Sequence, residues 1–500
     1  MTDDELAAVL ARARERVDPT PDERARLEAA TERLLARTEA AVADLPVEAD
    51  AVLVGSTARG TWIAGDRDVD LFVRFPPALG RAELEAHGLA VGHRVLPGGR
   101  EEYAEHPYVT GAFEGFDVDC VPCFRVENAA ESRSAVDRTP FHTRYLETRL
   151  DDALAADVRL LKGFLAAIGV YGSDLRTRGF SGYLAELLVL EHGGFRALVG
   201  AAADWSPPVR LDPQDHATRA FDDPLVVIDP TDPERNVAAV LSPTNLARFQ
   251  HYARELLADP RIALFERDTP GPLSPTAVRT EIERRGTTPI AVRFGAPELV
   301  DDQLYPQLEK SLAGVRRALD AAGFDVLRAA AFAAGTDDAA DASGATDGTD
   351  ASTDGANVTA TTGGADGETG VDAARSGDAD GDGRGIAVLL CECAVAERPP
   401  IERHEGPPLG AREHAAGFHE KYADADCYGP FVEGDRYVVE REREYRKPRA
   451  VLESALFDVG LGTNVEPALR EGHELLVGRD CAALARTFGV ELARYFDPEP

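Results

Sequence analysis

Lysine is the residue that this chain of 500 residues most clearly lacks. Lysine and arginine together number 54, but only four are lysines: Lys162, Lys310, Lys421 and Lys447. Acidic residues number 88, so the net charge is −34. Taken alone, this charge argues against a nucleic acid as partner. The acidic residues are spread along the whole chain, however, which favours adaptation to a cytoplasm of very high salt.

Cysteine is also scarce, and its spacing forms no disulfide framework, so we expect a reducing environment. The six cysteines are Cys120, Cys123, Cys391, Cys393, Cys427 and Cys481. The C-x-x-C motif of Cys120 and Cys123 would suit zinc or redox chemistry. Pro122 lies between them, however, and no second pair is suitably spaced. We interpret this pair as structural, and the Cys391–Cys393 pair likewise.

Long apolar runs are absent, so no segment is predicted to cross a bilayer. The N-terminus is acidic and lacks the apolar core of a signal peptide, so we expect a cytoplasmic protein. Residues 335–385 contain almost no large apolar side chain and are predicted to be disordered, because they cannot offset their ordering entropy. Residues 378–383 resemble part of a calcium loop, but the closing glutamate is missing, which favours a solvated linker.

The length predicts three or four domains, and the apolar patterns suggest where they lie. Residues 3–43 are expected to be helical. Strands are predicted at 51–54, 69–73 and 116–122, which makes a small mixed α/β module. Residues 148–257 have a helical pattern. Later segments are shorter and predict a third, α+β region; its expected elements are strands at 290–294 and 386–391 and a helix at 308–321.

Paired carboxylates are the strongest chemical signal. Asp68 and Asp70 stand two residues apart, so on a strand their side chains share a face and can share one hard cation. Asp119 on the strand at 116–122 is a suitable third carboxylate, and Asp117 points the same way and competes for that role. Such a trio is what two-metal nucleotidyl transfer requires. The alternative is that these are exposed strand acids in a very acidic protein.

A phosphate-binding turn precedes the carboxylates. Gly55 would allow the backbone to approach a triphosphate, and Ser56 offers a hydroxyl and an amide. Arg59 could bind a phosphate oxygen in bidentate fashion. A Gly-Ser pair alone is equally typical of an ordinary strand-to-helix turn, so its value is its short distance from Asp68 and Asp70.

These residues resemble the signature of the DNA polymerase β-like nucleotidyltransferase superfamily. Further segments resemble the archaeal, class I CCA-adding enzymes (tRNA nucleotidyltransferases), including the haloarchaeal type. These segments are residues 134–142, 159–165, 171–172, 178–183 and 235–238. The resemblance is specific over residues 23–265 and weaker towards the C-terminus.

The resemblance implies a role for each matching residue. Asp68, Asp70 and Asp119 would bind two Mg²⁺ ions; the family often has Glu at the first position. The incoming CTP or ATP would contact Gly55, Ser56, Arg59, His142, Lys162 and Tyr171. Arg235 would help to read the base. A lone His142 would more often be structural, and a lysine such as Lys162 more often lies on a helix surface.

The resemblance also implies an α+β multidomain fold. A polymerase-β-like head would span residues 1–147, a helical neck that recognises the base 148–268, and an RRM-like body with a tRNA-binding tail 269–500. The expected partners are tRNA, CTP and ATP, and the expected assembly is a homodimer.

Two alternatives stay open: another template-independent polymerase, such as a poly(A) type, and a catalytically inactive RNA-binding homologue. For the tRNA contact we expect a local arginine face made by Arg436, Arg441, Arg443, Arg446 and Arg449. The alternative for that segment is an ordinary solvated face.

Overall fold

The computed structural model describes residues 3–103, 106–134, 136–335 and 385–500. The chain divides into two compact units, residues 1–268 and 269–499. The segment 335–385, predicted to be disordered, lies almost entirely outside the described residues. None of the described helices is both long enough and apolar enough to span a bilayer.

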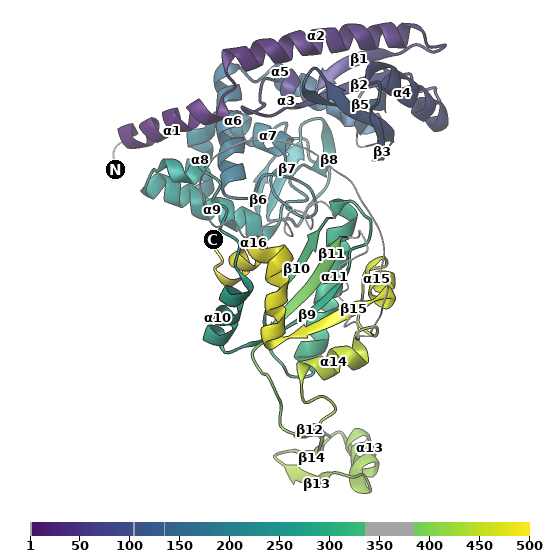
Figure 1. Cartoon of the computed structure of the whole chain (residues 1–500), viewed down its shortest axis with the longest axis vertical. Coiled ribbons are helices and arrows are strands. Elements are labelled where there is room, and N and C mark those ends of the chain that lie inside the picture. Colours follow the sequence, from purple (N-terminus) through teal and green to yellow (C-terminus); the bar gives the residue numbers. More distant parts are fainter. Residues whose placement is uncertain (1–2, 104–105, 135, 336–384) are drawn as a thin grey trace, which may run out of the picture. The chain divides into compact units, whose positions relative to one another are not determined.

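The first unit contains both helices and strands (Figure 1). Its helices are α1 (Asp3–Val17), α2 (Pro21–Ala43), α3 (Gly55–Ala58), α4 (Arg81–Val95), α5 (Thr139–Glu147), α6 (Asp152–Ala167), α7 (Gly182–His192), α8 (Phe195–Asp204) and α9 (Pro243–Ala258), with 3₁₀ turns η1 (Ala129–Glu131), η2 (Val136–Arg138) and η3 (Ile262–Phe265). Its strands are β1 (Asp50–Val54), β2 (Asp68–Phe75), β3 (Arg100–Tyr103), β4 (Pro107–Phe113), β5 (Phe116–Phe124), β6 (Val209–Leu211), β7 (Leu225–Asp229) and β8 (Asp232–Asn236).

The first sheet has the order β1-β2-β5-β4-β3, and only the β2–β5 pair is parallel. Alternation along β2 divides its side chains between the two faces. Val69, Leu71 and Val73 pack in a hydrophobic core with α2 and α4. Asp68 and Asp70 therefore lie on the opposite face. The strands predicted from the sequence are present, whereas β3, β4 and α4 were not predicted.

One helix predicted at residues 3–43 is in fact two. Thr20 caps α2: its hydroxyl accepts from the Glu23 backbone N–H at 3.2 Å, and the Glu23 carboxylate accepts from the Thr20 N–H at 2.7 Å. This capping box, with Pro21 at the first helical position, starts a new helix. The first helix, α1, packs instead in the core formed by α6 to α9.

The helical pattern predicted for 148–257 is interrupted. A three-stranded sheet, β6-β7-β8, lies between α8 and α9. Residues Leu225–Asp229 are all buried, so β7 is a short apolar strand that periodicity alone does not separate from a buried helix. This sheet brings Asp229 and Arg235 towards α5 and α7.

The second unit is built around an antiparallel sheet with the order β10-β11-β9-β15. Its strands are β9 (Thr288–Gly295), β10 (Val326–Ala334), β11 (Ile386–Cys393), β12 (Ile401–Pro408), β13 (Tyr428–Glu433), β14 (Arg436–Glu442) and β15 (His473–Val477). Its helices are α10 (Pro275–Arg285), α11 (Asp301–Ala321), α13 (Arg412–Ala423), α14 (Pro448–Ala455), α15 (Val465–Glu471) and α16 (Ala485–Phe496), with the 3₁₀ segment η4 (Gly478–Leu484).

Both faces of this sheet are covered. One face packs on α11, α14 and α15, and the other on α10, η4 and α16. An RRM-like body was expected, and such modules leave one sheet face open for bases. Here α10 and α16 cover that face. A second, smaller sheet, β12-β14-β13, carries α13 and follows β11 in the chain.

Candidate active site

The predicted carboxylates lie side by side on β2 and β5. In the parallel register Asp70 stands opposite Asp119, and Asp68 stands opposite Asp117. All four line one pocket of about 530 Å³, together with Val69, Gly98, Arg100, Thr110, Gly111 and Ala112. The structure therefore brings the three expected carboxylates together, and it leaves Asp117 as the neighbour of Asp68.

The negative charge in this pocket is crowded. Burial, and then the charge of Asp119, raise the pKa of Asp70 from its ordinary value of 3.8 to about 6. Burial and the neighbouring carboxylates of Asp66 and Asp117 raise the pKa of Asp68. Two acids with raised pKa values in one pocket indicate a place where a cation relieves repulsion.

The donor set suits a hard cation, because carboxylate oxygens are the ligands that Mg²⁺ prefers. Gly55 permits the close packing: its φ is +73°, and a Cβ there would lie 1.9 Å from Asp70 Oδ2. Across the described part of the chain, no three acidic, histidine or cysteine side chains already converge as a metal site. Metal binding would thus require the carboxylates to draw closer.

Arg59 is held by a buried acid rather than pointing freely into solvent. Its Nε and Nη2 donate to Glu186 Oε1 and Oε2 at 3.0 and 2.8 Å, and its Nη1 donates to Thr143 Oγ1 at 2.9 Å. The Glu186 side chain on α7 is fully buried. Ser56 precedes this arginine on α3, and its carbonyl accepts from the Thr61 backbone N–H at 3.0 Å.

Lys162 and Tyr171 belong to the same cluster. Lys162 Nζ donates to the Thr61 carbonyl at 2.9 Å and lies 4.0 Å from Glu186 Oε1. Lys162 is buried, not a surface lysine, and burial lowers its pKa. Burial also raises the pKa of Tyr171 far above its ordinary value. A Cβ on Gly182 would lie 3.2 Å from the Tyr171 hydroxyl and 3.6 Å from Lys162 Nζ, so both groups converge there.

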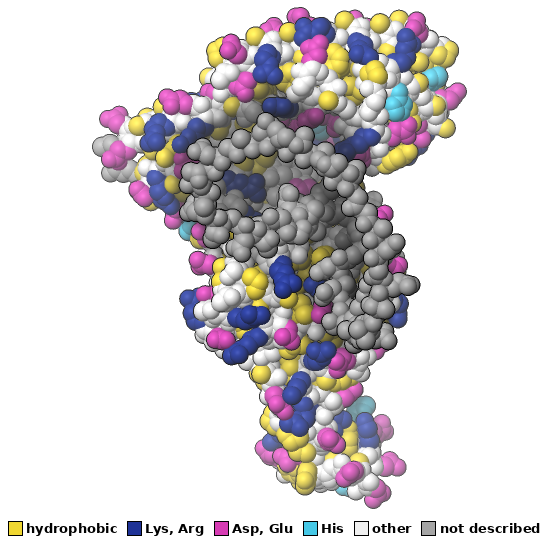
Figure 2. Space-filling model, in the orientation of Figure 1, with side chains coloured by type: hydrophobic (Ala, Val, Ile, Leu, Met, Phe, Trp, Pro, Cys, Tyr) yellow, Lys and Arg dark blue, Asp and Glu magenta, His cyan; other side chains and the backbone are white. Residues whose placement is uncertain are grey.

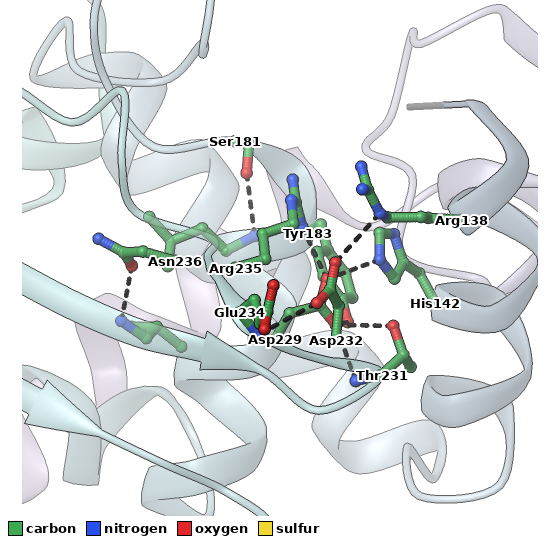
Figure 3. Close-up of polar contacts among 12 residues, drawn as sticks. Arg138, His142, Ser181, Tyr183, Asp229, Thr231, Asp232, Glu234, Arg235 and Asn236 are labelled. Carbon is green, nitrogen blue, oxygen red and sulfur yellow. Dashed lines mark hydrogen bonds and ion pairs between the residues drawn. The ribbon is translucent and has the colours of Figure 1, made fainter. Parts of the chain in front are cut away.

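His142 and Arg235 meet at a second acid, Asp229 (Figure 3). His142 Nε2 lies 2.9 Å from Asp229 Oδ2, and Arg235 Nη1 donates to the same oxygen at 2.8 Å. The His142 ring stacks on Tyr183 with the ring centroids 4.0 Å apart. Burial lowers the pKa of His142, against the opposing effect of Asp229.

Two helices join these clusters. On α5, His142 contacts Asp229 while the adjacent Thr143 accepts from Arg59. On α7, Tyr183 and Glu186 stand three residues apart and so share a face. Five of the predicted nucleotide-contacting residues thus fall into two connected groups: Arg59, Lys162 and Tyr171 near Glu186, and His142 and Arg235 at Asp229.

Sequence reasoning missed both central acids. Glu186 lies within an otherwise apolar stretch of α7, and Asp229 ends an apolar strand. A lone acid in an apolar run was the available signal, because a buried carboxylate needs donors.

Sequence reasoning also missed Asp137. Its carboxylate accepts from the backbone N–H groups of Phe124, Arg133 and Ser134 at 2.7 to 2.9 Å and fixes the turn before α5.

The five arginines expected to form a basic face are all ion-paired. Their partners are Glu405 and Asp435 for Arg436, Glu402 for both Arg441 and Arg443, Glu397 for Arg446, and Glu453 for Arg449. Figure 2 likewise shows basic and acidic side chains intermingled over the face that it draws, outside the grey atoms. Each of the five arginines is therefore paired with a neighbouring carboxylate, and Arg436 and Arg441, five residues apart on β14, point to opposite faces of that strand.

The cysteine pairs are packed in hydrophobic surroundings. Cys120 belongs to the core under α2 and α4, and Cys123 to a small cluster with Val54 and Phe72. The thiols of Cys120 and Cys123 therefore pack in different hydrophobic clusters. Burial raises the pKa of Cys120 to about 12, and of Cys391 and Cys393 likewise. These thiols are poorly suited to ionise.

Solved structures resemble this chain only distantly. A CdnC from E. coli MS115-1 is 18% identical, with a TM-score of 0.40, 52% of this chain covered and 94% of that chain. A Cid1 poly(U) polymerase is 17% identical, with a TM-score of 0.40, 54% of this chain covered and 100% of that chain.

Comparison of sequences is far more specific. Three family models match in succession: a nucleotidyltransferase domain at 35–142, the second domain of tRNA nucleotidyltransferase at 156–266, and the C-terminal domain of CCA-adding enzymes at 285–340 and 368–478.

Relatives named CCA-adding enzyme align over the whole length. The one from Haloarcula marismortui is 59% identical over 99% of this chain and 100% of its own. Those from Halorubrum lacusprofundi and Halobacterium salinarum are 57% and 53% identical, over 99% and 100% of this chain and 100% of theirs. This chain belongs to the family of CCA-adding enzymes.

Proposed function

We propose that this chain adds C, C and A in sequence to the 3′ end of tRNA, using CTP and ATP. Membership of the family supports the reaction. The observation that carries the proposal is the register of β2 and β5, which sets Asp70 opposite Asp119 in one pocket with Asp68 beside them.

Each group has a part in this chemistry. Asp68, Asp70 and Asp119 are the residues to hold two Mg²⁺ ions, which when bound stabilise charge on the reacting phosphoryl group. The tRNA 3′-hydroxyl attacks the α-phosphorus of the nucleotide and pyrophosphate leaves. The protein contributes mainly position and charge.

The remaining contacts bind and orient the nucleotide. Gly55, Ser56, Arg59, Lys162 and Tyr171 are proposed to hold the triphosphate. Two observations support this: Glu186 gathers the cations Arg59 and Lys162, and Arg59 lies near enough to Asp70 to lower the pKa of that carboxyl. Gly55 lies against Asp70 itself. His142 and Arg235 are proposed to contact the nucleotide from the Asp229 side.

We also propose the division into head (1–147), neck (148–268) and body with tail (269–500). The boundary between the two compact units after residue 268 supports the second limit. A homodimer is proposed on family grounds, and light scattering at high salt measures the assembly. A reducing cytoplasm is proposed because cysteines are few and form no disulfide framework.

One assay tests the function against its rivals. A tRNA transcript without its CCA end is incubated with each labelled nucleotide and Mg²⁺ at high salt. Incorporation of two C and one A, and then arrest, is expected. A long A tail would indicate a poly(A)-type polymerase. No incorporation would favour an inactive homologue.

The metal site is tested in the same assay. Asp70→Ala should abolish incorporation and leave tRNA binding, measured by filter retention, largely intact. Retained incorporation would show that the carboxylates are not the catalytic site.

A further inference from the structure

The carboxylate of Asp229 is the centre of the second cluster. It is fully buried at the end of β7, and Figure 3 shows the donors around it. Oδ2 faces His142 and Arg235, while Oδ1 accepts from the Tyr183 hydroxyl at 3.2 Å and from the Thr231 backbone N–H and hydroxyl at 2.9 and 2.8 Å. Such a set of donors fixes the carboxylate in one orientation.

The charge state of Asp229 follows from these contacts. Burial alone would raise its pKa, but the hydrogen bonds from His142 and Thr231 outweigh burial and hold the pKa of Asp229 below its ordinary value. An ionised carboxylate can only accept hydrogen bonds, so the His142 nitrogen facing it, Nε2, carries a proton. Asp229 therefore orients His142 as well as Arg235.

Arg235 is anchored at one point and accessible at the rest. Its bond to Asp229 uses Nη1, and its side chain is 36% exposed while Asp229 is not exposed at all. A guanidinium carries five N–H donors in a rigid plane. This contact holds the Nη1 end of the guanidinium at Asp229 and restricts how the plane can turn, and the other N–H donors remain for a ligand.

Fixed donors can separate the two correct bases from the two wrong ones. N3 of cytosine and N1 of adenine are lone-pair acceptors, whereas N3 of uracil and N1 of guanine each carry a hydrogen. An N–H donor held towards that ring position forms a hydrogen bond with C or A. With U or G the same donor faces another N–H group and forms no bond. A guanidinium that could turn would reach O4 of uracil or O6 of guanine instead.

We propose that Asp229 is a positioning residue that sets base selection by holding Arg235 in place and restricting how its guanidinium turns, a role that rests on the proposed function. Asp229 touches no reacting group. It acts through Arg235, and its loss should change which nucleotide is chosen more than how fast transfer occurs.

The test uses the full-length protein and tRNA transcripts ending before the first C or before the A. The kcat/KM values for CTP against UTP, and for ATP against GTP, give two preference ratios. Asp229→Asn keeps the size and shape of the side chain. Its amide has only one accepting oxygen, so the donors on one side of residue 229 lose their acceptor and face an NH₂ group. Both ratios should fall about ten- to a hundredfold. In an Arg235→Ala background the same substitution should change neither ratio further.

Asp232→Asn is the matched control. Asp232 begins β8 and also pairs with an arginine, but with Arg138 at 3.2 Å, so its variant should leave both ratios unchanged. If Asp229→Asn does not fold by circular dichroism, Asp229→Glu keeps the charge but displaces Arg235, and both ratios should still fall.

The outcomes separate this inference from the function itself. Unchanged ratios in a folded Asp229 variant, even with lower kcat/KM for every nucleotide, would overturn the inference and leave CCA addition standing. A further fall in the Arg235→Ala background would show that Asp229 acts elsewhere. If the wild-type protein adds neither C nor A, the proposed function falls and this inference falls with it.

Discussion

The raised pKa of Asp70 means that its ionised carboxylate destabilises the folded protein. Its pKa is about 6 in the folded chain and near 3.8 when unfolded, so the folded state binds the extra proton between these values. Stability therefore falls as pH rises from about 4 to 6, and at neutral pH the whole penalty is present.

Asp70→Asn removes that penalty. At pH 7 without Mg²⁺ the variant should be more stable than the wild type by up to roughly 3 kcal/mol, and the difference should shrink as the pH falls from about 6 to 4. Thermal unfolding at several pH values measures this. A variant less stable than the wild type at pH 7 would show that crowding of the carboxylates is not a cost in the folded protein.

Removing the charge of Glu186 from its buried pair with Arg59 should have the opposite effect on stability to Asp70→Asn. Glu186→Gln leaves Arg59 without its charged partner and places an amide among donors, so unfolding should become easier by about 3–5 kcal/mol. Urea denaturation measures the change. Glu114→Gln is the control, because Glu114 forms a similar two-point pair with Arg33 on the exposed surface and its loss should change little. Equal effects of the two variants would contradict the argument from burial.

At the scale of elements, the turn from β1 into α3 sets the shape of the carboxylate pocket. Gly55→Ala would place a Cβ against Asp70 Oδ2 and would strain a backbone with positive φ. We expect a stability loss of about 1–2 kcal/mol and a clear rise in the Mg²⁺ concentration needed for half-maximal activity.

Gly60 provides the control for that prediction. Its φ is +65°, but no atom lies within 4 Å of a Cβ added there. Gly60→Ala should therefore lose similar stability without changing the Mg²⁺ requirement. A raised Mg²⁺ requirement in both variants would mean that backbone strain, rather than the contact with Asp70, sets the metal response.

The elements that carry the carboxylates could be predicted because their signal is local. Asp68 and Asp70 share a strand face by spacing alone, and Asp119 sits on another alternating strand. The pairings made by the two central acids could not be predicted this way, because Arg59 and Glu186 lie 127 residues apart and meet only through packing of α7. Likewise β7 was hidden in a helical pattern, so the meeting of His142 with Asp229 had no sequence signal.

At the scale of the whole molecule, the larger sheet of the second unit, as far as the structure describes it, offers RNA no open face. Because α10 and α16 cover the β10-β11-β9-β15 sheet, stacking of bases on its strands, as in RRM modules, is not available. Recognition of a tRNA stem by shape and backbone must then use other surfaces. The arginines of β14 and of the segment after it are the cations predicted for this role.

The ion pairs of these arginines lead to a specific prediction about how tRNA binding depends on salt concentration. Glu402 accepts from Arg441 at 2.8 Å and from Arg443 at 3.2 Å, so phosphate must compete with one carboxylate for two cations. Glu402→Gln removes the competing charge. Binding of tRNA should tighten at moderate salt, and the slope of log affinity against log salt should steepen by about one for each additional phosphate that an arginine binds.

The control for Glu402→Gln must make the same charge change elsewhere in the unit. Glu466→Gln does so, because Glu466 pairs with Arg470 within α15, outside the proposed arginine surface. Affinities measured over a range of KCl concentrations should then differ between the two variants. If both move the slope equally, net charge alone governs tRNA binding, and the arginines around Glu402 hold no phosphate. A steeper slope for Glu402→Gln alone would place the phosphate contacts at these arginines, in a molecule whose net charge of −34 gives no hint of them.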